Sequence, residues 1–326
     1  MHKDKKAILR RVAQVLIASL IAIGMIALFV FVTQGRDMPV LDTHGLIANQ
    51  ERDLIYLTFG LGLLVVIPVL WMLFAIAWKY RAGNTKAKYE PEMDGSKKLE
   101  ILWWGIPIII IIALAIITAI STHALDPYKP IESSVEPVEV QVVAIEWNWL
   151  FIYPDNGVAT LNYLNIPEDT PINFTITSDA PMNSFWVPAL AGQVYAMSGM
   201  STKLHVMADT VGTYDGSSAN ISGEGFASMR FKVNSMTESD FSAWVIKSAN
   251  SKDMLTSESY TELAKPGADK GEKTYMLMKK DLYNEIIMKY MSHDTSGKEA
   301  HTKNETESHD MKQMDHGDHD MSGMDM

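Results

Sequence analysis

The sequence predicts a membrane α + β protein. N-terminal transmembrane helices (a hairpin plus a signal or anchor segment) precede an antiparallel β-sandwich and a short helical C-terminal region. Three uncharged apolar runs lie within the first 122 of the 326 residues. Short alternating strand patterns follow, and helical spacing of apolar residues returns near the C-terminal end. The chain has no cysteine, which excludes disulfides, thiolate metal sites and iron–sulfur clusters.

Residues 1–35 form either a signal sequence or a retained membrane anchor. Lysines and arginines precede the first apolar run, Val12–Val32, and this order is typical of a secretory signal. The run is longer than the usual signal core of about 7–15 residues, which favours a retained anchor. Thr33 and Gly35 are small enough to permit cleavage after Gly35, so both interpretations stay open.

Residues 36–122 contain a transmembrane hairpin with spans at 54–78 and 101–120, neither of which carries a charged side chain. About 20 helical residues cover the roughly 30 Å hydrocarbon core of a bilayer. Basic residues cluster before the first run and between the two spans, whereas only Arg36 and Arg52 lie between the first run and the second. The positive-inside rule therefore predicts that everything after Ile120 lies outside the cytoplasm.

From residue 136 to residue 235 the apolar pattern has a period of two. The alternating stretches are 138–142, 172–177, 204–208 and 229–233, with turn signals at 154–157 and 211–213. Several short strands at this spacing predict an antiparallel β-sandwich. About 100 residues are enough to bury a core.

Residues 236–292 form a helical, aromatic-rich region in which Phe241, Trp244 and Tyr260 are expected to pack on the sandwich or on a partner. Residues 293–326 form a His/Met/Asp-rich tail that is too polar to pack and is expected to be disordered. Its His309, His316 and His319 are weak metal-ligand candidates. The formal net charge of −11 argues against a nucleic-acid partner, because phosphate binding needs a basic surface.

Four motifs, spread over most of the chain, resemble subunit II of the haem–copper respiratory oxidases. They are Trp78-Lys79-Tyr80-Arg81, Glu146-Trp147-Asn148-Trp149, Asn183-Ser184-Phe185-Trp186-Val187-Pro188 and Gly212-Thr213-Tyr214. The resemblance implies that the sandwich is cupredoxin-like, lies in the periplasm and caps a haem–copper subunit I.

The chain departs from the copper-bearing branch of that family at the copper ligands. The branch holds a dinuclear copper centre with histidine, cysteine, glutamate and methionine ligands. The matching positions here are Asn183, Ser218, Asn220, Ser222, Phe226 and Met229. A serine hydroxyl does not ionise near pH 7 and is too hard to bridge copper, and phenylalanine has no lone pair. These six residues are therefore interpreted as degenerate copper-site positions and not as ligands.

Loss of this centre within the same scaffold resembles the quinol-oxidase branch. The resemblance implies a non-catalytic subunit of a proton-pumping enzyme that oxidises (ubi)quinol and reduces oxygen to water in the bacterial inner membrane. Haems and copper are expected in partner subunit I, with none in this chain. The expected partners are subunit I, the smaller subunits, membrane lipid and quinol reached through subunit I, but not cytochrome c. The alternative is a membrane-tethered periplasmic copper-binding protein that uses the tail.

Glu100 is the candidate for a role in proton uptake. It opens the third apolar run after Lys97 and Lys98, where a carboxylate is also favoured by the helix N-terminal dipole. In quinol oxidases a glutamate matching this position is associated with a proton channel of the neighbouring subunit. Trp147 and Trp149 are expected to pack, and His44, His123 and His205 are expected to be surface or interface histidines.

Overall fold

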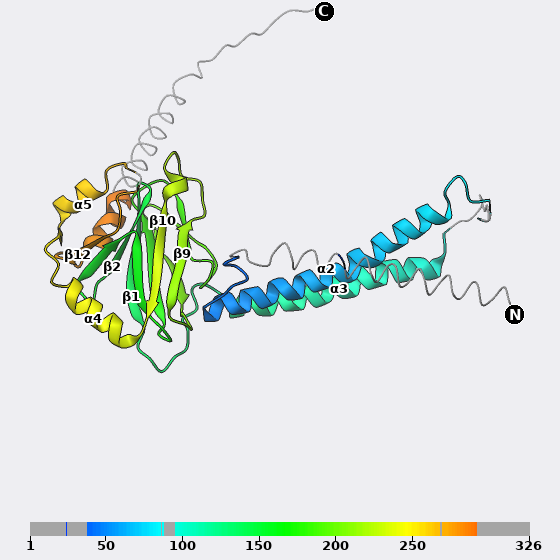
Figure 1. Cartoon of the computed structure of the whole chain (residues 1–326), viewed down its shortest axis with the longest axis horizontal. Helices are drawn as coiled ribbons and strands as arrows, with labels where there is room; N and C mark the ends of the chain where they lie inside the picture. Colours follow the sequence, from blue (N-terminus) through cyan, green and yellow to red (C-terminus); the bar gives the residue numbers. More distant parts are fainter. Residues whose placement is uncertain (1–23, 25–37, 86, 88–94, 268, 292–326) are drawn as a thin grey trace, which may run out of the picture.

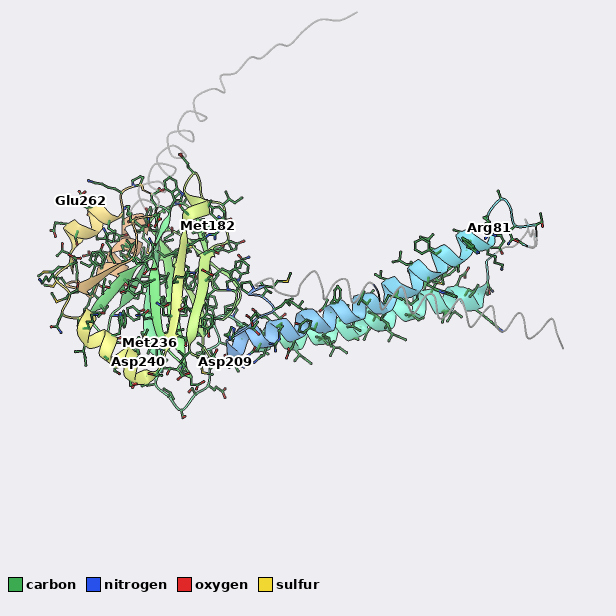
Figure 2. All side chains as sticks on the ribbon, in the orientation of Figure 1. Arg81, Met182, Asp209, Met236, Asp240 and Glu262 are labelled. Carbon is green, nitrogen blue, oxygen red and sulfur yellow. The ribbon has the colours of Figure 1, made fainter. Side chains whose placement is uncertain are left out.

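The computed structural model describes residues 24, 38–85, 87, 95–267 and 269–291. Two long helices, α2 (Leu46–Lys79) and α3 (Lys97–Ala124), run side by side away from one end of a β-sandwich (Figure 1). Both are long and apolar enough to cross a membrane. Figure 2 places Arg81 at the far end of this hairpin and Asp209 beside its junction with the sandwich. The predicted pair of long apolar helices is confirmed.

The first turn of α2 is joined to the sandwich by backbone hydrogen bonds. Leu46 N–H donates to the Met207 carbonyl at 3.2 Å, and Ala48 N–H donates to the Leu190 carbonyl at 3.1 Å. The first N–H groups of a helix have no partner within the helix, and Gly45 at its N-cap provides no side-chain cap. The sandwich therefore supplies the missing acceptors and couples the hairpin to the outer domain.

Two sheets form the sandwich, as the alternating patterns predicted. One has seven strands in the order β11-β12-β3-β2-β1-β5-β8, and the other has five in the order β4-β10-β9-β6-β7. The strands of the first sheet are β1 (Val138–Ile145), β2 (Asn148–Tyr153), β3 (Val158–Leu161), β5 (Ile172–Ser178), β8 (Thr202–Val206), β11 (Met254–Leu255) and β12 (Lys273–Leu277). Those of the second are β4 (Tyr163–Pro167), β6 (Asn183–Trp186), β7 (Val194–Ala196), β9 (Gly212–Ser218) and β10 (Arg230–Met236).

Most of the strand pairs are antiparallel, but β1–β5, β4–β10 and β11–β12 are parallel. The alternation of side chains has the same period in both kinds of ladder, so the sequence pattern could not distinguish them. The main core lies between the two sheets. There Phe185 stacks on Phe231 at a centroid distance of 5.3 Å, and the edge of Trp149 meets Phe185 at 5.5 Å.

A second core lies on the outer face of the seven-stranded sheet. Helices α4 (Glu238–Ser248) and α5 (Ser257–Leu263) and the helical residues 282–291 flank the sandwich (Figure 1). Leu150 and Ile152 of β2 are buried there with Tyr260, Leu282 and Ile286. The predicted packing of the C-terminal aromatic residues on the sandwich is thus confirmed. The region also supplies β11 and β12 to the sheet, where the sequence predicted helices alone.

Candidate functional site

The six degenerate copper-site positions lie at one end of the five-stranded sheet. Asn183 begins β6 and Ser218 ends β9, the antiparallel neighbour of β6. The loop after β9 carries Asn220 and Ser222, and then enters a short 3-10 helix (Phe226–Ser228) that is followed by Met229. The fold therefore brings these positions together although they lie up to about 45 residues apart in the sequence.

Three of the six positions are linked to one another by hydrogen bonds. Ser218 Oγ lies 3.0 Å from Asn183 Oδ1 and 3.2 Å from the Asn220 carbonyl oxygen. The Asn183 amide donates to the Pro181 carbonyl at 2.7 Å, and the Asn220 amide donates to the Met182 carbonyl at 2.8 Å. The polar atoms of these side chains are thus used within the protein.

Trp147 covers the loop from one side. It has a left-handed backbone conformation, with φ of 56°, and its Nε1 donates to the Ser222 carbonyl at 3.4 Å. A Cβ atom on Gly225 would lie 2.4 Å from the Trp147 ring, so glycine is required for this close approach. Trp147 and the fully buried Trp149 pack as the sequence predicted.

These residues do not fit a dinuclear copper centre. The thioether of Met229 is buried in the core, and Asn183, Ser218 and Asn220 offer amide and hydroxyl groups that bond one another or the neighbouring backbone. Copper is bound in proteins by thiolate, imidazole and thioether groups. In the part of the chain that the structure describes, no group of three or more His, Asp or Glu side chains is placed to hold a metal ion.

Glu100 lies in the first turn of α3, at the end of the hairpin far from the sandwich. Its backbone N–H donates to the Ser96 carbonyl at 2.9 Å. Its carboxylate lies over Gly95, where an added Cβ would come within 2.8 Å of Oε1. The side chain is exposed, so it is accessible from the side of the membrane on which Lys97 and Lys98 lie.

The structure corrects the prediction for His205, which is buried and not at the surface. Only 8% of the residue is exposed, and its Nδ1 lies 2.7 Å from Asn173 Oδ1. Strand alternation correctly placed it on the polar face of β8, but no local pattern indicates that other segments cover this face. His44 stacks on Tyr214 at the base of α2, and His123 is an exposed residue near the end of α3.

A buried carboxylate that the sequence did not single out organises the C-terminal region. Asp179 follows β5, and its side chain is 1% exposed. It accepts hydrogen bonds from Tyr260 Oη at 2.7 Å, Lys289 Nζ at 2.6 Å and Tyr290 Oη at 2.7 Å. These donors lie 81 to 111 residues away in the sequence, so no local pattern could have revealed the cluster. The tail candidates His309, His316 and His319 lie outside the described residues.

Family models match three stretches of the chain. They are described as "Cytochrome C oxidase subunit II, transmembrane domain" over residues 43–119, "Cytochrome C oxidase subunit II, periplasmic domain" over residues 157–236, and "COX Aromatic Rich Motif" over residues 249–294. The first contains the hairpin, and the second contains the degenerate copper-site positions. The third contains Tyr260, Lys289 and Tyr290, the partners of Asp179.

Curated relatives extend over most of the chain. The cytochrome bo(3) ubiquinol oxidase subunit 2 of Pseudomonas putida is 47% identical over 256 residues, which are 78% of this chain and 82% of the relative. The subunit of the same name from Pseudomonas aeruginosa is 44% identical over 90% of this chain and 87% of the relative. The quinol oxidase subunit 2 of Bacillus subtilis is 42% identical over 73% of this chain and 75% of the relative. The chain therefore belongs to the quinol oxidase subunit 2 family.

Proposed function

We propose that this chain is the subunit of a proton-pumping terminal oxidase that caps and anchors the haem–copper subunit I. That enzyme oxidises (ubi)quinol and reduces oxygen to water. The names of the curated relatives support this function. The haems and the copper belong to subunit I, and the smaller subunits complete the complex. These relatives do not favour a free-standing copper-binding protein.

The observation that carries the proposal is the hydrogen-bonded state of the degenerate copper-site positions. Asn183, Ser218 and Asn220 bond one another and the neighbouring backbone, so an outer-domain copper port for electrons is not available. Electrons must then reach the complex by another route. Quinol dissolved in the membrane supplies them directly to subunit I, and cytochrome c is not a partner.

The hairpin gives the complex its orientation. The basic residues at the far end of the hairpin include Lys79, Arg81, Lys97 and Lys98, and positive charge marks the cytoplasmic side of a membrane protein. The hairpin accordingly spans the bacterial inner membrane, and the sandwich lies in the periplasm. This placement puts Glu100 at the cytoplasmic side.

Oxygen uptake by the complex, purified through a tag on this chain, tests the proposed function. Reduced ubiquinone analogue is supplied in one assay and reduced cytochrome c in the other. Turnover with the quinol alone is expected. Turnover with cytochrome c would contradict the proposal, and purification of the chain without any haem protein would restore the copper-binding alternative.

The position of Glu100 supports a role in proton uptake. A carboxylate at the cytoplasmic water boundary can collect protons for a path in the neighbouring subunit. Glu100→Gln keeps the size of the side chain and removes its charge, so we expect about 10-fold or greater loss of quinol turnover, measured with proton pumping in vesicles. The matched control is Asp53→Asn. Asp53 lies in α2 at the end of the hairpin near the sandwich, opposite to the end that carries Glu100, so this variant should leave both rates unchanged. Equal rates for Glu100→Gln and the unmodified complex would disprove this role.

A further inference from the structure

Three methionines share one face at the edge of the seven-stranded sheet. Met254 lies in the edge strand β11, Met276 lies in β12, and Met278 directly follows β12. The two strands pair in parallel, with Met254 opposite Met276. Paired residues of a ladder point to the same side of the sheet, and so do residues two apart along one strand. These three residues therefore form one cluster, the methionine edge.

The backbone on both strands of the methionine edge is held by hydrogen bonds. Met276 N–H donates to the Asp253 carbonyl at 2.8 Å, and Met278 N–H donates to the Leu255 carbonyl at 3.2 Å. The parallel ladder thus continues to Met278, with neighbouring strands about 4.8 Å apart and alternate residues about 6.6 Å apart. A methionine side chain has three rotatable bonds, so the three sulfur atoms can approach one point while the backbone stays fixed.

The methionine edge is open to solvent and does not fill a core. Met254 is 48% exposed and Met278 is 54% exposed, whereas Leu255 and Leu277, on the opposite face of the same strands, are buried in the second core. A methionine that fills a gap in a core would be buried. β12 lies on the side of the sandwich away from the hairpin (Figure 1), so these thioethers face the aqueous side of the molecule.

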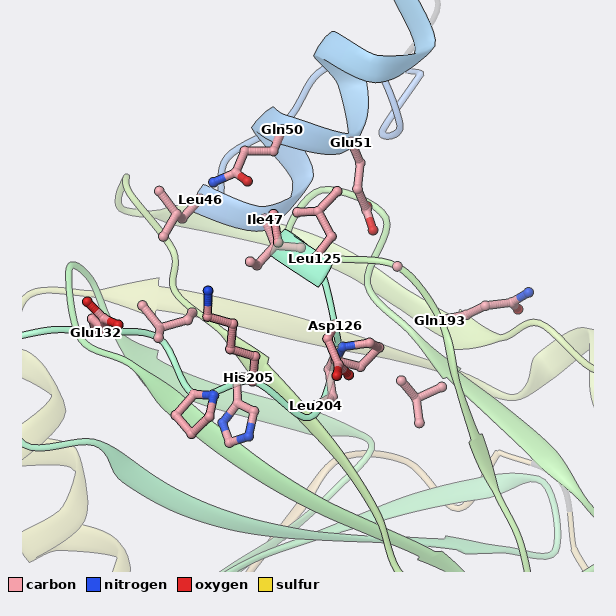
Figure 3. Close-up of a pocket in the computed structure, with 17 residues that line it drawn as sticks. Leu46, Ile47, Gln50, Glu51, Leu125, Asp126, Glu132, Gln193, Leu204 and His205 are labelled. Carbon is pink, nitrogen blue, oxygen red and sulfur yellow. The ribbon is translucent and has the colours of Figure 1, made fainter. Parts of the chain in front are cut away.

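The ligand atoms of the methionine edge are soft and uncharged. Thioethers select Cu(I), whereas carboxylate, carbonyl and water oxygens suit hard cations. The pocket where the hairpin meets the sandwich has the opposite chemistry, because its lining includes the carboxylates of Glu51, Asp126 and Glu132 (Figure 3). The methionine edge is therefore suited to a soft monovalent metal, and this pocket is not.

We propose that Met254, Met276 and Met278 bind Cu(I) through their three thioether sulfurs. The metal keeps its oxidation state on binding and release, so the site needs no electron donor. Ag(I), which is also soft and monovalent, binds in the same way, whereas Zn²⁺ and Ni²⁺ do not. Thioethers bind no proton in the pH range in which imidazole does, so the site is chemically distinct from the histidine-containing tail.

Oxidation of individual methionines in the purified complex, followed by peptide mass spectrometry, tests this proposal. Dilute peroxide converts accessible thioethers to sulfoxides, and a sulfur bound to a metal is protected. With Ag(I), oxidation of Met254 and Met278 is expected to slow about tenfold or more. The control is Met288, which is 59% exposed on the final helical residues and should oxidise at an unchanged rate.

Two results of the oxidation experiment would overturn the proposal. The first is an equal effect of Ag(I) on Met288 and on the methionine edge, including no effect on either. The second is slow oxidation of Met254 and Met278 without silver, which would mean that another subunit covers them.

Replacement of the ligands provides a second test. Met254→Leu combined with Met278→Leu keeps the apolar volume, so an interface or packing role would survive. The complex is expected to lose about one equivalent of Cu(I) held against a colorimetric Cu(I) chelator, whereas Met288→Leu should match the unmodified complex. The tail is present in all three samples, so its contribution cancels. Unchanged binding by the double variant would overturn the proposal. Neither test depends on turnover, so a failure of the quinol-oxidase proposal would be recognised separately.

Discussion

Asp179 joins three segments of the chain that are far apart in the sequence. One carboxylate accepts hydrogen bonds from α5 through Tyr260 and from the final helical residues through Lys289 and Tyr290. A buried carboxylate is tolerated only when it is paired and hydrogen-bonded. These three donors therefore have to be in place before the region is stable.

Asp179→Asn is expected to loosen residues 282–291 by about 1–3 kcal/mol, because it removes the charge that two hydroxyls and an ammonium share. The cost lies below that of a fully buried pair, since the Lys289 side chain is 59% exposed. The measurement is the rate of proteolytic cleavage of these residues in the purified complex. Asp155→Asn, at an exposed turn, is the control, and equal cleavage of the two variants would contradict the role of Asp179.

The same cluster predicts instability at alkaline pH. Burial and the contact with Asp179 raise the pKa of Tyr290 to about 12 and raise the pKa of Tyr260 as well. An unfolded tyrosine loses its proton near pH 10, so the unfolded chain binds fewer protons than the folded chain above that value. The contribution of Tyr260 and Tyr290 to the free energy of unfolding should stay constant below about pH 9 and decrease as the pH rises above about 10. Urea unfolding at a series of pH values measures this, and Tyr260→Phe with Tyr290→Phe should flatten the fall.

The loss of the copper ligands can be predicted from residue chemistry alone. A serine at position 218 is unsuitable for copper wherever it lies, so its interpretation as a degenerate position did not require the fold. The hydrogen bonds between Ser218 and Asn183 did require it, because strand pairing brings them together. His205 was misjudged for the same reason, since its burial depends on what covers its strand.

Among the elements, α2 is the one whose backbone hydrogen bonds join the hairpin to the sandwich. Its first turn donates to the Met207 and Leu190 carbonyls of the sandwich, and these bonds need a close approach at Gly45. A Cβ there would lie 2.8 Å from the Leu190 carbonyl oxygen and 3.0 Å from that of Met207. The backbone at this junction has no room for a side chain.

Gly45→Ala is therefore expected to destabilise the junction by about 1–3 kcal/mol, through loss of the two backbone hydrogen bonds. The midpoint of thermal unfolding of the complex should fall by a few degrees. The matched control is Gly83→Ala, because an added Cβ at Gly83 has no neighbour within 4 Å. If the two variants unfold at the same temperature, the hairpin and the sandwich are not coupled through this contact.

The elements that the sequence revealed were those with one polar face or a long apolar run. The alternation of β1, β5 and β10 survives because one side of each strand is more polar. β2 is buried along its whole length and shows no alternation, since the second core covers its outer face. β11, at two residues, is too short for a periodic signal, and β12 has two polar residues followed by three apolar ones, so it shows no alternation.

At the scale of the whole molecule, the hairpin and the sandwich were predicted, whereas the three-layer arrangement of the outer domain was not. Hydropathy identifies a membrane helix from local composition, and each helix of the hairpin meets that condition by itself. The helical layer over the seven-stranded sheet depends on contacts between segments about 100 residues apart, which a single sequence does not display.

Removal of residues 293–326 is expected to leave assembly and quinol turnover unchanged, because Asp179 and its partners all precede the tail. Retention of copper or nickel by the purified complex should fall, since the tail carries His309, His316 and His319. Both are measured on the complex purified through a tag on another subunit. Failure of the truncated chain to assemble would favour a dedicated role for the tail in copper delivery.

The position of β12 within the seven-stranded sheet sets the order in which the outer domain can mature. β12 pairs with β3 on one side and with β11 on the other, so β3 keeps an open edge until residue 277 has been synthesised. An open edge is a template for pairing with another chain. A nascent or truncated polypeptide that ends before this strand is therefore prone to aggregation. The outer domain can cover this edge only after synthesis has passed residue 277.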